Sequence, residues 1–216
     1  MNIILIGDSG HGKVIADIVM SNGDNIVAKL DDKYNGIFHN DGCYYGPVSE
    51  VKELIKKKQA KVIISVGSNT IRRNIVERLN LSYEHYAISI HKQTFISPSA
   101  KIGKGTVIMP GAVVNADASI GSHSIVNSNA VIEHDCIIED FTHVSPGSIM
   151  AGGVKLGEGV HVGAGATVIP IKKIGKWSVV GAGSVVLGDI KEFSTAVGIP
   201  AKVIKTNEVK SEKLTK

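Results

Sequence analysis

The feature that most constrains the fold is an aliphatic residue that recurs at every sixth position in the second half of the chain. Sixteen consecutive positions fit this period without a gap: Ile96, Ile102, Ile108, Val114, Ile120, Val126, Ile132, Ile138, Val144, Met150, Leu156, Val162, Val168, Ile174, Val180 and Val186. A period of six fits neither an amphipathic helix nor a simple alternating strand. It predicts a parallel β-helix in which each six-residue segment forms one flat side of a coil.

Three such sides make a coil of eighteen residues, so the repeat predicts a little over five coils, with about 4.8 Å between neighbouring strands. One aliphatic residue per side fills the axis, and the residue four positions later is usually small, which lets the chain bend without overfilling the interior. Lys172 is the clear exception to this rule. Glycine follows the aliphatic position where a corner must turn, at Gly103, Gly121, Gly157, Gly163, Gly175 and Gly181. We therefore predict an all-β domain over residues 91–206.

Residues 1–90 have a different rhythm, in which short apolar runs alternate with helical patterns. Strands are expected at 2–6, 26–30, 61–66 and 85–90, and helices at 11–22, 49–58 and 68–80. This alternation predicts a Rossmann-like α/β domain with a small parallel sheet, which binds ligands at the carboxyl ends of its strands. The last segment, residues 207–216, reads NEVKSEKLTK and is expected to be a flexible charged tail.

The first strand ends in a glycine-rich turn, GDSGHGK at 7–13. Its spacing matches GxxxxGK of a phosphate loop, but Val14 stands where a Ser or Thr should hold Mg²⁺, which argues against a triphosphate hydrolase. A glycine turn that leads into a helix still offers free N–H groups and a positive dipole end to an anion. We interpret it as a diphosphate site; the alternative is a tight turn that only joins strand to helix.

Composition excludes several classes of protein. A net charge of +4 is too small and too scattered to indicate nucleic-acid binding. No apolar run reaches the roughly 18 residues of a membrane span, and the first residues lack the pattern of a signal peptide, so a soluble cytoplasmic protein is expected. The two cysteines, Cys43 and Cys136, form no CxxC motif and indicate neither a disulfide framework nor a zinc cluster.

Two histidines, His134 and His143, stand nine residues apart in VIEHDCIIEDFTHV. A histidine on a repeat strand is more often a solvated surface residue than a catalyst. His134, however, occupies the third place of its hexad, so its side chain is expected to project outward near a corner. Asp135 can reach the same ring only if the chain turns there, because adjacent residues on a flat strand face opposite ways. His161 lies eighteen residues after His143 and should stack on it.

The whole pattern resembles the left-handed β-helix of the hexapeptide-repeat acyltransferases. The closing segment VGIPAKVI at 197–204 is similar to the end that many members share. The opening GDSGHGKV and the EHD motif at 133–135, with a second histidine nine residues after the first, narrow the resemblance to sugar acetyltransferases of the sialic acid and bacillosamine type. The resemblance implies a cytoplasmic homotrimer with active sites between subunits, acetyl-CoA as co-substrate, and N-acetylation of the 4-amino group of a UDP-linked amino-dideoxy sugar.

The resemblance also implies residue roles. His134 would be the general base and Asp135 its orienting carboxylate, and no metal is implied. Acetyl-CoA would meet His143, Gly152, Gly153, Ala164, Ala182, Gly183 and Lys202, with Gly152 or Gly153 donating a backbone N–H to the oxyanion. The nucleotide sugar would meet Ser9, Gly10, His11, Gly12, Asp31, Asp32, Lys33, Gly67, Ser68, Asn69, Arg72 and His143, with Arg72 pairing with the diphosphate. Asp8 puts a negative charge near that diphosphate and counts against this contact. The alternative for Ala164, Ala182 and Gly183 is ordinary corner packing, and for Lys202 a solvated charge.

Three other functions remain open at this stage. The first is O-acetylation of sialic acid or another sugar hydroxyl. The second is a β-helical zinc carbonic anhydrase, for which His134, His143 and His161 supply the count of ligands. The third is a purely structural or binding module.

Overall fold

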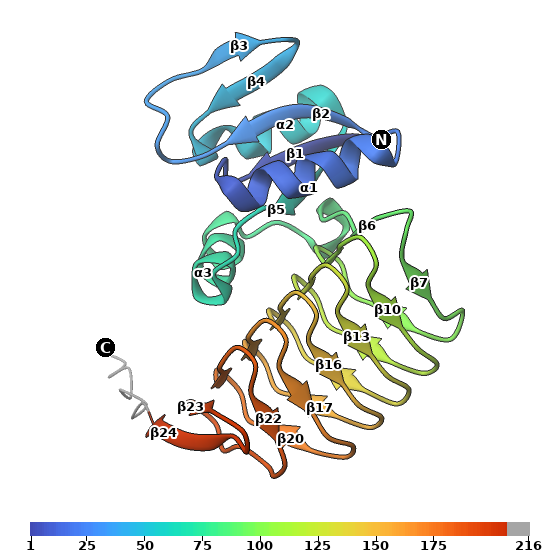
Figure 1. Ribbon diagram of the computed structural model, residues 1–216. Coiled ribbons are helices and arrows are strands. Elements are labelled where there is room, and N and C mark those ends of the chain that lie inside the picture. The colour runs from blue at the N-terminus through green and yellow to red at the C-terminus, as the bar shows by residue number, and fades with distance from the viewer. Residues whose placement is uncertain (207–216) are drawn as a thin grey trace.

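The computed structural model describes residues 1–206 and contains two domains (Figure 1). The amino-terminal sheet has the order β3-β4-β2-β1-β5, and its pairs are parallel except for β3 with β4. Its elements are β1 (Asn2–Ile6), α1 (Gly10–Ser21), β2 (Asn25–Leu30), β3 (Phe38–Asn40), β4 (Cys43–Gly46), a 3₁₀ turn (Val48–Glu50), α2 (Val51–Lys58), β5 (Ala60–Ile64), α3 (Asn69–Leu79) and a second 3₁₀ turn (Tyr83–His85). The predicted Rossmann-like α/β arrangement is thus present.

The β3–β4 hairpin has no counterpart among the predicted strands. Its stability comes from aromatic contacts rather than from a buried apolar face. Phe38 stacks on Tyr45 with ring centroids 5.1 Å apart, and Phe38 and Tyr34 form an edge-to-face pair with ring centroids 5.4 Å apart. Such cross-strand pairs stabilise a short edge strand without leaving an alternating hydrophobic pattern in the sequence.

The second domain is a parallel β-helix with three sheets, which we call I, II and III. Sheet I contains β7 (Phe95–Ile96), β10 (Val113–Val114), β13 (Val131–Ile132), β16 (Ile149–Met150), β19 (Thr167–Val168) and β22 (Val185–Val186). Sheet II contains β8 (Lys101–Ile102), β11 (Ser119–Ile120), β14 (Ile137–Ile138), β17 (Lys155–Leu156) and β20 (Lys173–Ile174). Sheet III contains β6 (Ser89–Ile90), β9 (Val107–Ile108), β12 (Ile125–Val126), β15 (His143–Val144), β18 (His161–Val162), β21 (Val179–Val180), β23 (Ser194–Val197) and β24 (Lys202–Thr206).

The hexad pattern corresponds to this architecture position by position. In sheet I, Val114 pairs with Ile132 and Ile132 with Met150, so residues eighteen apart stack directly. Of the sixteen aliphatic positions, fourteen are almost fully buried in one continuous core, and Ile96 and Ile102 at its open end are partly buried. The predicted β-helix is therefore confirmed. Its first strand, β6, lies just before the predicted domain start at residue 91.

The small corner residues include buried hydroxyls, and these find partners inside the coil. The hydroxyl of Thr106 donates to the carbonyl of Gly121 at 2.7 Å, and that of Thr142 donates to the Ser124 oxygen at 3.0 Å. Ser124 in turn donates to the carbonyl of Glu139 at 3.1 Å. A buried hydroxyl without a partner would cost about 1–3 kcal/mol, so these bonds allow Ser and Thr to replace Ala at the corners.

The corner glycines are required by close backbone approach. A Cβ atom on Gly121 would lie 2.5 Å from the backbone nitrogen of Asp140 in the next coil. Such a contact is shorter than van der Waals packing allows, so any larger residue would push the coils apart. This is the physical reason for the recurring glycine after the aliphatic position.

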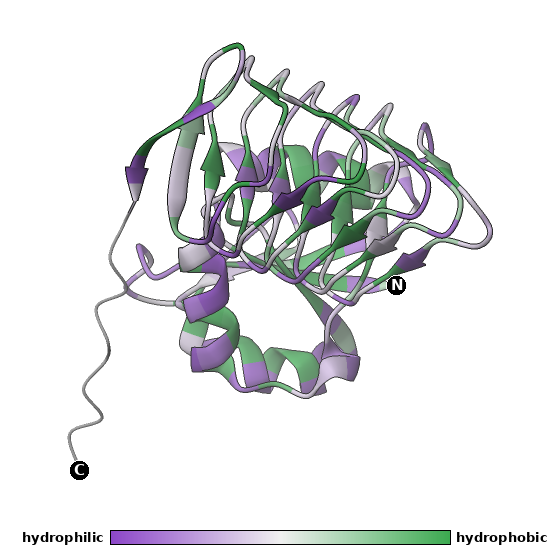
Figure 2. Ribbon diagram, turned by 90° about the horizontal axis from the view of Figure 1, so that it is seen from below, coloured by the Kyte–Doolittle hydropathy of each residue, from purple (hydrophilic) through white to green (hydrophobic). Residues whose placement is uncertain are grey.

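One face of the amino-terminal sheet packs on the first coils, with α1 at the junction (Figure 1). Ile3, Leu5 and Ile15 share a buried cluster with Val107 and Ile125 of sheet III. Figure 2 shows the helices gathered on one side of the stack of coils. None of the helices within residues 1–206 is long and apolar enough to cross a membrane. The predicted tail, residues 207–216, lies outside the described residues.

Candidate active site

His134 and Asp135 lie on the corner between sheets I and II, which we call the I/II edge. The Nδ1 atom of His134 is 2.8 Å from Oδ2 of Asp135. Asp135 has a φ of 59°, in the left-handed region, and this turn brings two successive side chains to the same side of the chain. The hydrogen bond to Asp135 raises the pKa of His134 above its usual value. Both side chains are largely exposed, at 63% and 68%, and Nε2 of His134 has no partner among residues 1–206.

Gly152 lies directly beneath this imidazole, one coil further along the same edge. A Cβ atom at Gly152 would stand 2.7 Å from both Cε1 and Nε2 of His134. The N–H of Gly152 bonds to no acceptor among the described residues, whereas the N–H of Gly153 donates to the carbonyl of His134 at 2.9 Å. The prediction that Gly153 could supply the oxyanion donor is therefore wrong, because its N–H is already used, and of the two residues only Gly152 has a free N–H among the described residues.

His143 lies on the outer face of sheet III, where the amino-terminal domain covers it. Its Nδ1 is 3.3 Å from the carbonyl oxygen of Gly67, and its Nε2 is 3.0 Å from the amide nitrogen of Asn127. These partners define a neutral ring with the proton on Nδ1. Burial lowers the pKa of His143 to about 3. His143 is therefore a neutral ring at ordinary pH, and both of its nitrogens are engaged by protein atoms.

The predicted stack of His143 on His161 is present, with parallel rings 4.9 Å apart. Nε2 of His161 is 2.9 Å from the hydroxyl of Ser145. Sequence reasoning missed Asn127 and Ser145, although both stand at the same corner position, eighteen residues apart. The signal in the sequence was a polar residue at a corner position that is otherwise occupied by small or apolar residues.

A pocket of about 500 Å³ lies between the start of α3 and sheet III. Its lining residues, which define the interdomain pocket, are Gly67, Ser68, Asn69, Thr70, His143, Gly159, His161, Trp177 and Val179. Ser68 caps α3 by accepting the N–H of Ile71, and Asn69 donates to the carbonyl of Gly159 at 3.0 Å. Of the residues predicted to bind substrate, Gly67, Ser68, Asn69 and His143 are thus brought together in one place.

Arg72 does not face this pocket. Its side chain is 1% exposed, and all five of its N–H groups have oxygen acceptors within the protein. The prediction that Arg72 pairs directly with a diphosphate is therefore wrong, because the guanidinium has neither a free donor nor access to solvent.

The glycine-rich turn positions Ser9, Gly10, His11 and Gly12 at the amino terminus of α1. Ser9 is the N-cap residue but makes no side-chain cap, and the N–H groups of Gly10, His11 and Gly12 have no acceptor among the described residues. A Cβ atom at Gly12 would lie 2.7 Å from the carbonyl oxygen of Gly7, so the tight turn requires glycine there. The ring of His11 is 6.2 Å from that of His143, which places this helix end beside the interdomain pocket.

The charge of Asp8 is compensated by its neighbours. Burial alone would raise the pKa of Asp8, but hydrogen bonds from Tyr34 and Lys33 prevail and lower it. Nζ of Lys33 lies 3.3 Å from Oδ2 of Asp8. Asp31 accepts the backbone N–H of Asp8 at 2.8 Å and that of Lys33 at 3.1 Å. Asp31 and Lys33 therefore shape the turn, and Asp8 adds little net negative charge there.

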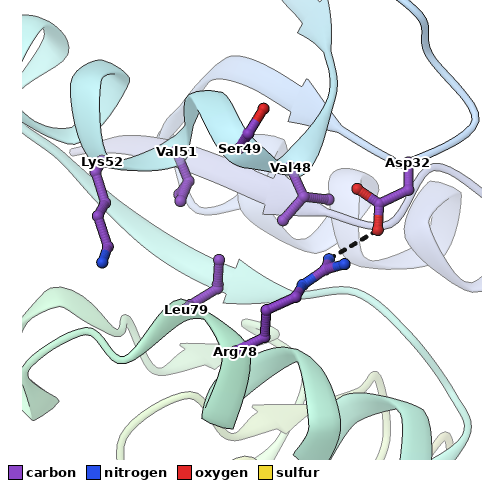
Figure 3. A pocket seen from close by; sticks show the side chains of 7 residues that line it. All are labelled: Asp32, Val48, Ser49, Val51, Lys52, Arg78 and Leu79. Atoms are coloured by element: carbon purple, nitrogen blue, oxygen red, sulfur yellow. Dashed lines mark ion pairs between the residues drawn. The ribbon is translucent and has the colours of Figure 1, made fainter.

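Asp32 borders a different pocket, of about 350 Å³, between α2 and the end of α3. Its carboxylate is 2.7 Å from the guanidinium of Arg78, across the mouth of this pocket (Figure 3). Ser49 and Lys52 add polar groups, and Val48, Val51 and Leu79 supply an apolar floor. The pocket lies at the carboxyl-terminal side of the sheet, where parallel folds bind ligands.

Ala164, Ala182 and Gly183 lie on the corner between sheets III and I, which we call the III/I edge. Lys202 is exposed in β24. Sheet I separates this edge from the I/II edge that carries His134. The residues predicted to bind acetyl-CoA therefore fall on the I/II edge, on the III/I edge, and, for His143 and Lys202, on strands of sheet III, so they do not all meet within one chain.

The three histidines of the carbonic anhydrase alternative do not converge in this chain. His134 is on the I/II edge, whereas His143 and His161 are on sheet III. Both ring nitrogens of His143 are also engaged by protein atoms. No group of three or more metal-ligating side chains occurs within residues 1–206.

Comparison with known proteins places these features in a family. Residues 2–79 match the PglD N-terminal domain, and residues 99–134 and 135–170 match the bacterial transferase hexapeptide repeat. A curated relative, UDP-N-acetylbacillosamine N-acetyltransferase of Bacillus subtilis, is 43% identical over 112 residues, which cover 50% of this chain. The matched segment spans about half (51%) of that relative.

Two solved structures match over almost the whole chain. PerB from Caulobacter crescentus, in complex with CoA and GDP-perosamine, is 31% identical with a TM-score of 0.86, and the match covers 95% of this chain and 98% of that one. The acetyltransferase domain of PglB from Neisseria gonorrhoeae, in complex with acetyl coenzyme A, is 33% identical with a TM-score of 0.85, and the match covers 94% and 98%. These matches confirm the left-handed β-helix. The chain therefore belongs to the hexapeptide-repeat sugar acetyltransferase family with a PglD-type N-terminal domain.

Proposed function

We propose that the protein is an acetyl-CoA-dependent N-acetyltransferase that acts on the 4-amino group of a UDP-linked amino-dideoxy sugar, for glycan or exopolysaccharide synthesis. The observation that carries the proposal is the oriented imidazole of His134, whose free Nε2 lies next to Gly152, a residue with an unused N–H. The relatives support the substrate class, because their names specify N-acetylation of UDP- or GDP-linked amino sugars. The cytoplasm is the proposed location, and the two free cysteines are consistent with a reducing compartment.

The reaction follows from these groups. Nε2 of His134 takes a proton as the neutral amine attacks the thioester carbon, and Asp135 stabilises the imidazolium that forms. The carbonyl oxygen becomes negative in the tetrahedral intermediate and accepts the N–H of Gly152. When the C–S bond breaks, the CoA sulfur leaves as a thiolate and takes the proton back from His134. The products are the N-acetyl sugar and CoA with a free thiol.

The nucleotide sugar is proposed to lie along the carboxyl-terminal side of the amino-terminal sheet. The nucleoside enters the pocket beside Asp32, and the diphosphate meets the free N–H groups at the start of α1. The sugar then reaches the interdomain pocket next to His143. Two contacts support this path: Asp31 accepts the N–H of Asp8 in the glycine-rich turn, and the ring of His11 lies beside that of His143.

The complete site is proposed to form between copies of the chain in a homotrimer. The outer column of sheet I is almost entirely apolar and has no partner within residues 1–206; it consists of Phe95, Val113, Val131, Ile149, Thr167 and Val185. If sheet I faces a threefold axis, the I/II edge of one copy approaches the III/I edge of the next. His134 of one copy then meets the edge that carries Ala164, Ala182 and Gly183 of its neighbour, which provides the acetyl-CoA groove.

A charged residue on sheet I should abolish this assembly. Ile149→Glu is expected to give monomers by sedimentation velocity and to lose acetyl transfer, because the interface would have to bury an unpaired carboxylate. Ile137→Glu is the matched control, since Ile137 is equally exposed (42% against 40%) but lies on sheet II, whose outer column carries Lys101, Lys155 and Lys173. A monomeric Ile137→Glu with a trimeric Ile149→Glu would move the interface to sheet II.

The pH dependence of kcat/KM should report the hydrogen bond between His134 and Asp135. The base must be deprotonated, so kcat/KM rises with pH through the pKa of His134, which Asp135 raises above its usual value. Asp135→Asn removes the charge and keeps a residue that tolerates the left-handed backbone, so the midpoint of the profile should move to lower pH. Asp117→Asn is the control, because Asp117 has the same conformation (φ 58°) one coil earlier, beside Ala116. An unchanged midpoint in Asp135→Asn would contradict this assignment.

The acceptor is tested directly with a panel of substrates. Purified protein is incubated with acetyl-CoA and a UDP-4-amino sugar, GDP-perosamine or sialic acid, and the free thiol is measured. We expect the greatest thiol release with a UDP-4-amino sugar. Acetylation of sialic acid alone would replace the proposal with the O-acetyltransferase alternative.

A further inference from the structure

Arg72 is a buried cation that is not used by the proposed reaction. Its Nε donates to the carbonyl of His123 at 2.6 Å, and its other N–H groups donate to the carbonyls of Val66, Gly67, Phe141 and Thr142 and to Oδ1 of Asn69. These acceptors belong to α3, to the loop before it and to two successive coils of the β-helix. Arg72 therefore fixes the two domains to each other at this point.

All the partners of this guanidinium are neutral. No carboxylate lies within ion-pair distance of Arg72 among residues 1–206. Burial lowers the pKa of Arg72 to about 9, which still leaves the group charged at neutral pH. Six hydrogen bonds that Arg72 donates to carbonyl and amide oxygens stabilise the cation, but they do not cancel its net charge. Arg72 is only 1% exposed, and an uncompensated positive charge at such a buried position requires an explanation beyond packing.

The interdomain pocket lies one layer away from this charge. Gly67 and Asn69 line the pocket with one side and accept hydrogen bonds from Arg72 with the other. None of the residues that line the pocket is acidic, and its two histidines, His143 and His161, both have pKa values lowered, first by burial and also by Arg72. The positive field of Arg72 therefore enters the pocket without an opposing charge in its wall.

We infer that Arg72 attracts the diphosphate of the nucleotide sugar through space, without touching the ligand. It acts as an uncompensated charge behind the wall of the interdomain pocket, which adjoins the start of α1, where the diphosphate is proposed to lie. The inference rests on the proposed function only in taking a nucleoside diphosphate as the ligand. A charge in a low-dielectric wall acts more strongly than one in water, and it favours an anionic ligand over its neutral analogue. Arg72 thereby serves both as the contact that fixes the two domains and as the source of anion selectivity.

The experiment measures binding of UDP and of uridine by titration calorimetry to the full-length protein, with GDP and guanosine in parallel. Arg72→Met removes the charge and keeps the length of the side chain, and Arg72→Lys keeps the charge with fewer hydrogen bonds. Arg73→Met is the matched control, because Arg73 is exposed and already paired with Glu77 and Glu158. We expect Arg72→Met to weaken nucleoside diphosphate binding about tenfold or more, and Arg72→Lys and Arg73→Met to stay within about threefold of wild type. Nucleoside binding should not change.

Two outcomes would overturn the inference. Equal losses in Arg72→Lys and Arg72→Met would assign Arg72 a purely structural role, and an unchanged affinity in Arg72→Met would remove it from ligand binding. If Arg72→Met fails to fold, Arg72→Gln is the second neutral variant. A measurement on wild type needs no variant: the preference for UDP over uridine must persist in about 0.5 M NaCl, because salt screens surface lysines but not a buried charge. Loss of that preference in salt would assign the attraction to surface groups. None of these binding measurements depends on acetyl transfer. The role of Arg72 in nucleotide binding can therefore be decided even if the proposed reaction is not observed.

Discussion

His134→Ala is expected to lower kcat by about 10²–10⁴-fold, which is the usual contribution of a general base. The protein should keep its stability, because the side chain is 63% exposed and its one hydrogen bond is to the neighbouring Asp135. KM for both substrates should change little, since the imidazole contributes mainly to proton transfer. The measurement is steady-state release of CoA thiol at saturating acetyl-CoA and nucleotide sugar, together with thermal unfolding.

His39→Ala is the control for this variant, because His39 is exposed on the β3–β4 hairpin, away from the I/II edge. It should retain full kcat. If His134→Ala retains full kcat, His134 takes no part in the reaction, and the result favours the alternative of a binding module. A loss of kcat accompanied by a lower unfolding temperature would instead indicate a structural role for the ring.

Gly152→Ala is expected to reduce kcat by about 10²-fold or more, a loss comparable to removal of the base or of an oxyanion donor. The added methyl would stand 2.7 Å from the His134 ring, which is exposed and can rotate away from the thioester. Gly152 has no positive φ, so alanine fits its backbone and the free energy of unfolding should not fall. The predicted signature is an inactive protein of normal stability.

Gly188→Ala is the matched control, since Gly188 occupies the same corner position thirty-six residues later and a Cβ atom there would meet nothing within 4 Å. It should retain activity and assembly. Full activity in Gly152→Ala would show that the position of the His134 ring next to this residue does not matter to the reaction. Partial activity that recovers in Gly152→Ser would contradict the steric explanation, because serine is at least as large as alanine.

The β-helix was predictable because its core imposes the period directly on the sequence. Each inward position must be aliphatic and the corner residues are usually small, so every coil carries the same sequence pattern. The β3–β4 hairpin was not predictable in this way, since Phe38 and Tyr45 stabilise it by one stacked pair that leaves no periodic pattern. In the amino-terminal domain, elements with a buried apolar face were found and the edge strand was missed.

The candidate site was predictable only in part, for a similar reason. His134 and Asp135 could be paired from the sequence because a corner was expected between them, and the left-handed backbone of Asp135 confirms that the chain turns there. The direction of Arg72 could not be inferred, since a residue in the first turn of a helix can point toward a ligand or back into the protein. The choice between Gly152 and Gly153 depended on which N–H the adjacent coil had already used.

The exact stacking of residues eighteen apart restricts how the length of such a chain can change. Six extra residues between His134 and Gly152 would carry the glycine around to a different side of the prism, and eighteen would interpose a whole coil between ring and N–H. Insertions and deletions on the flat sides are therefore tolerated only in complete turns, and even those alter the spacing of the site. At the I/II edge, changes in the catalytic groups must therefore arise by exchange of corner residues at constant length.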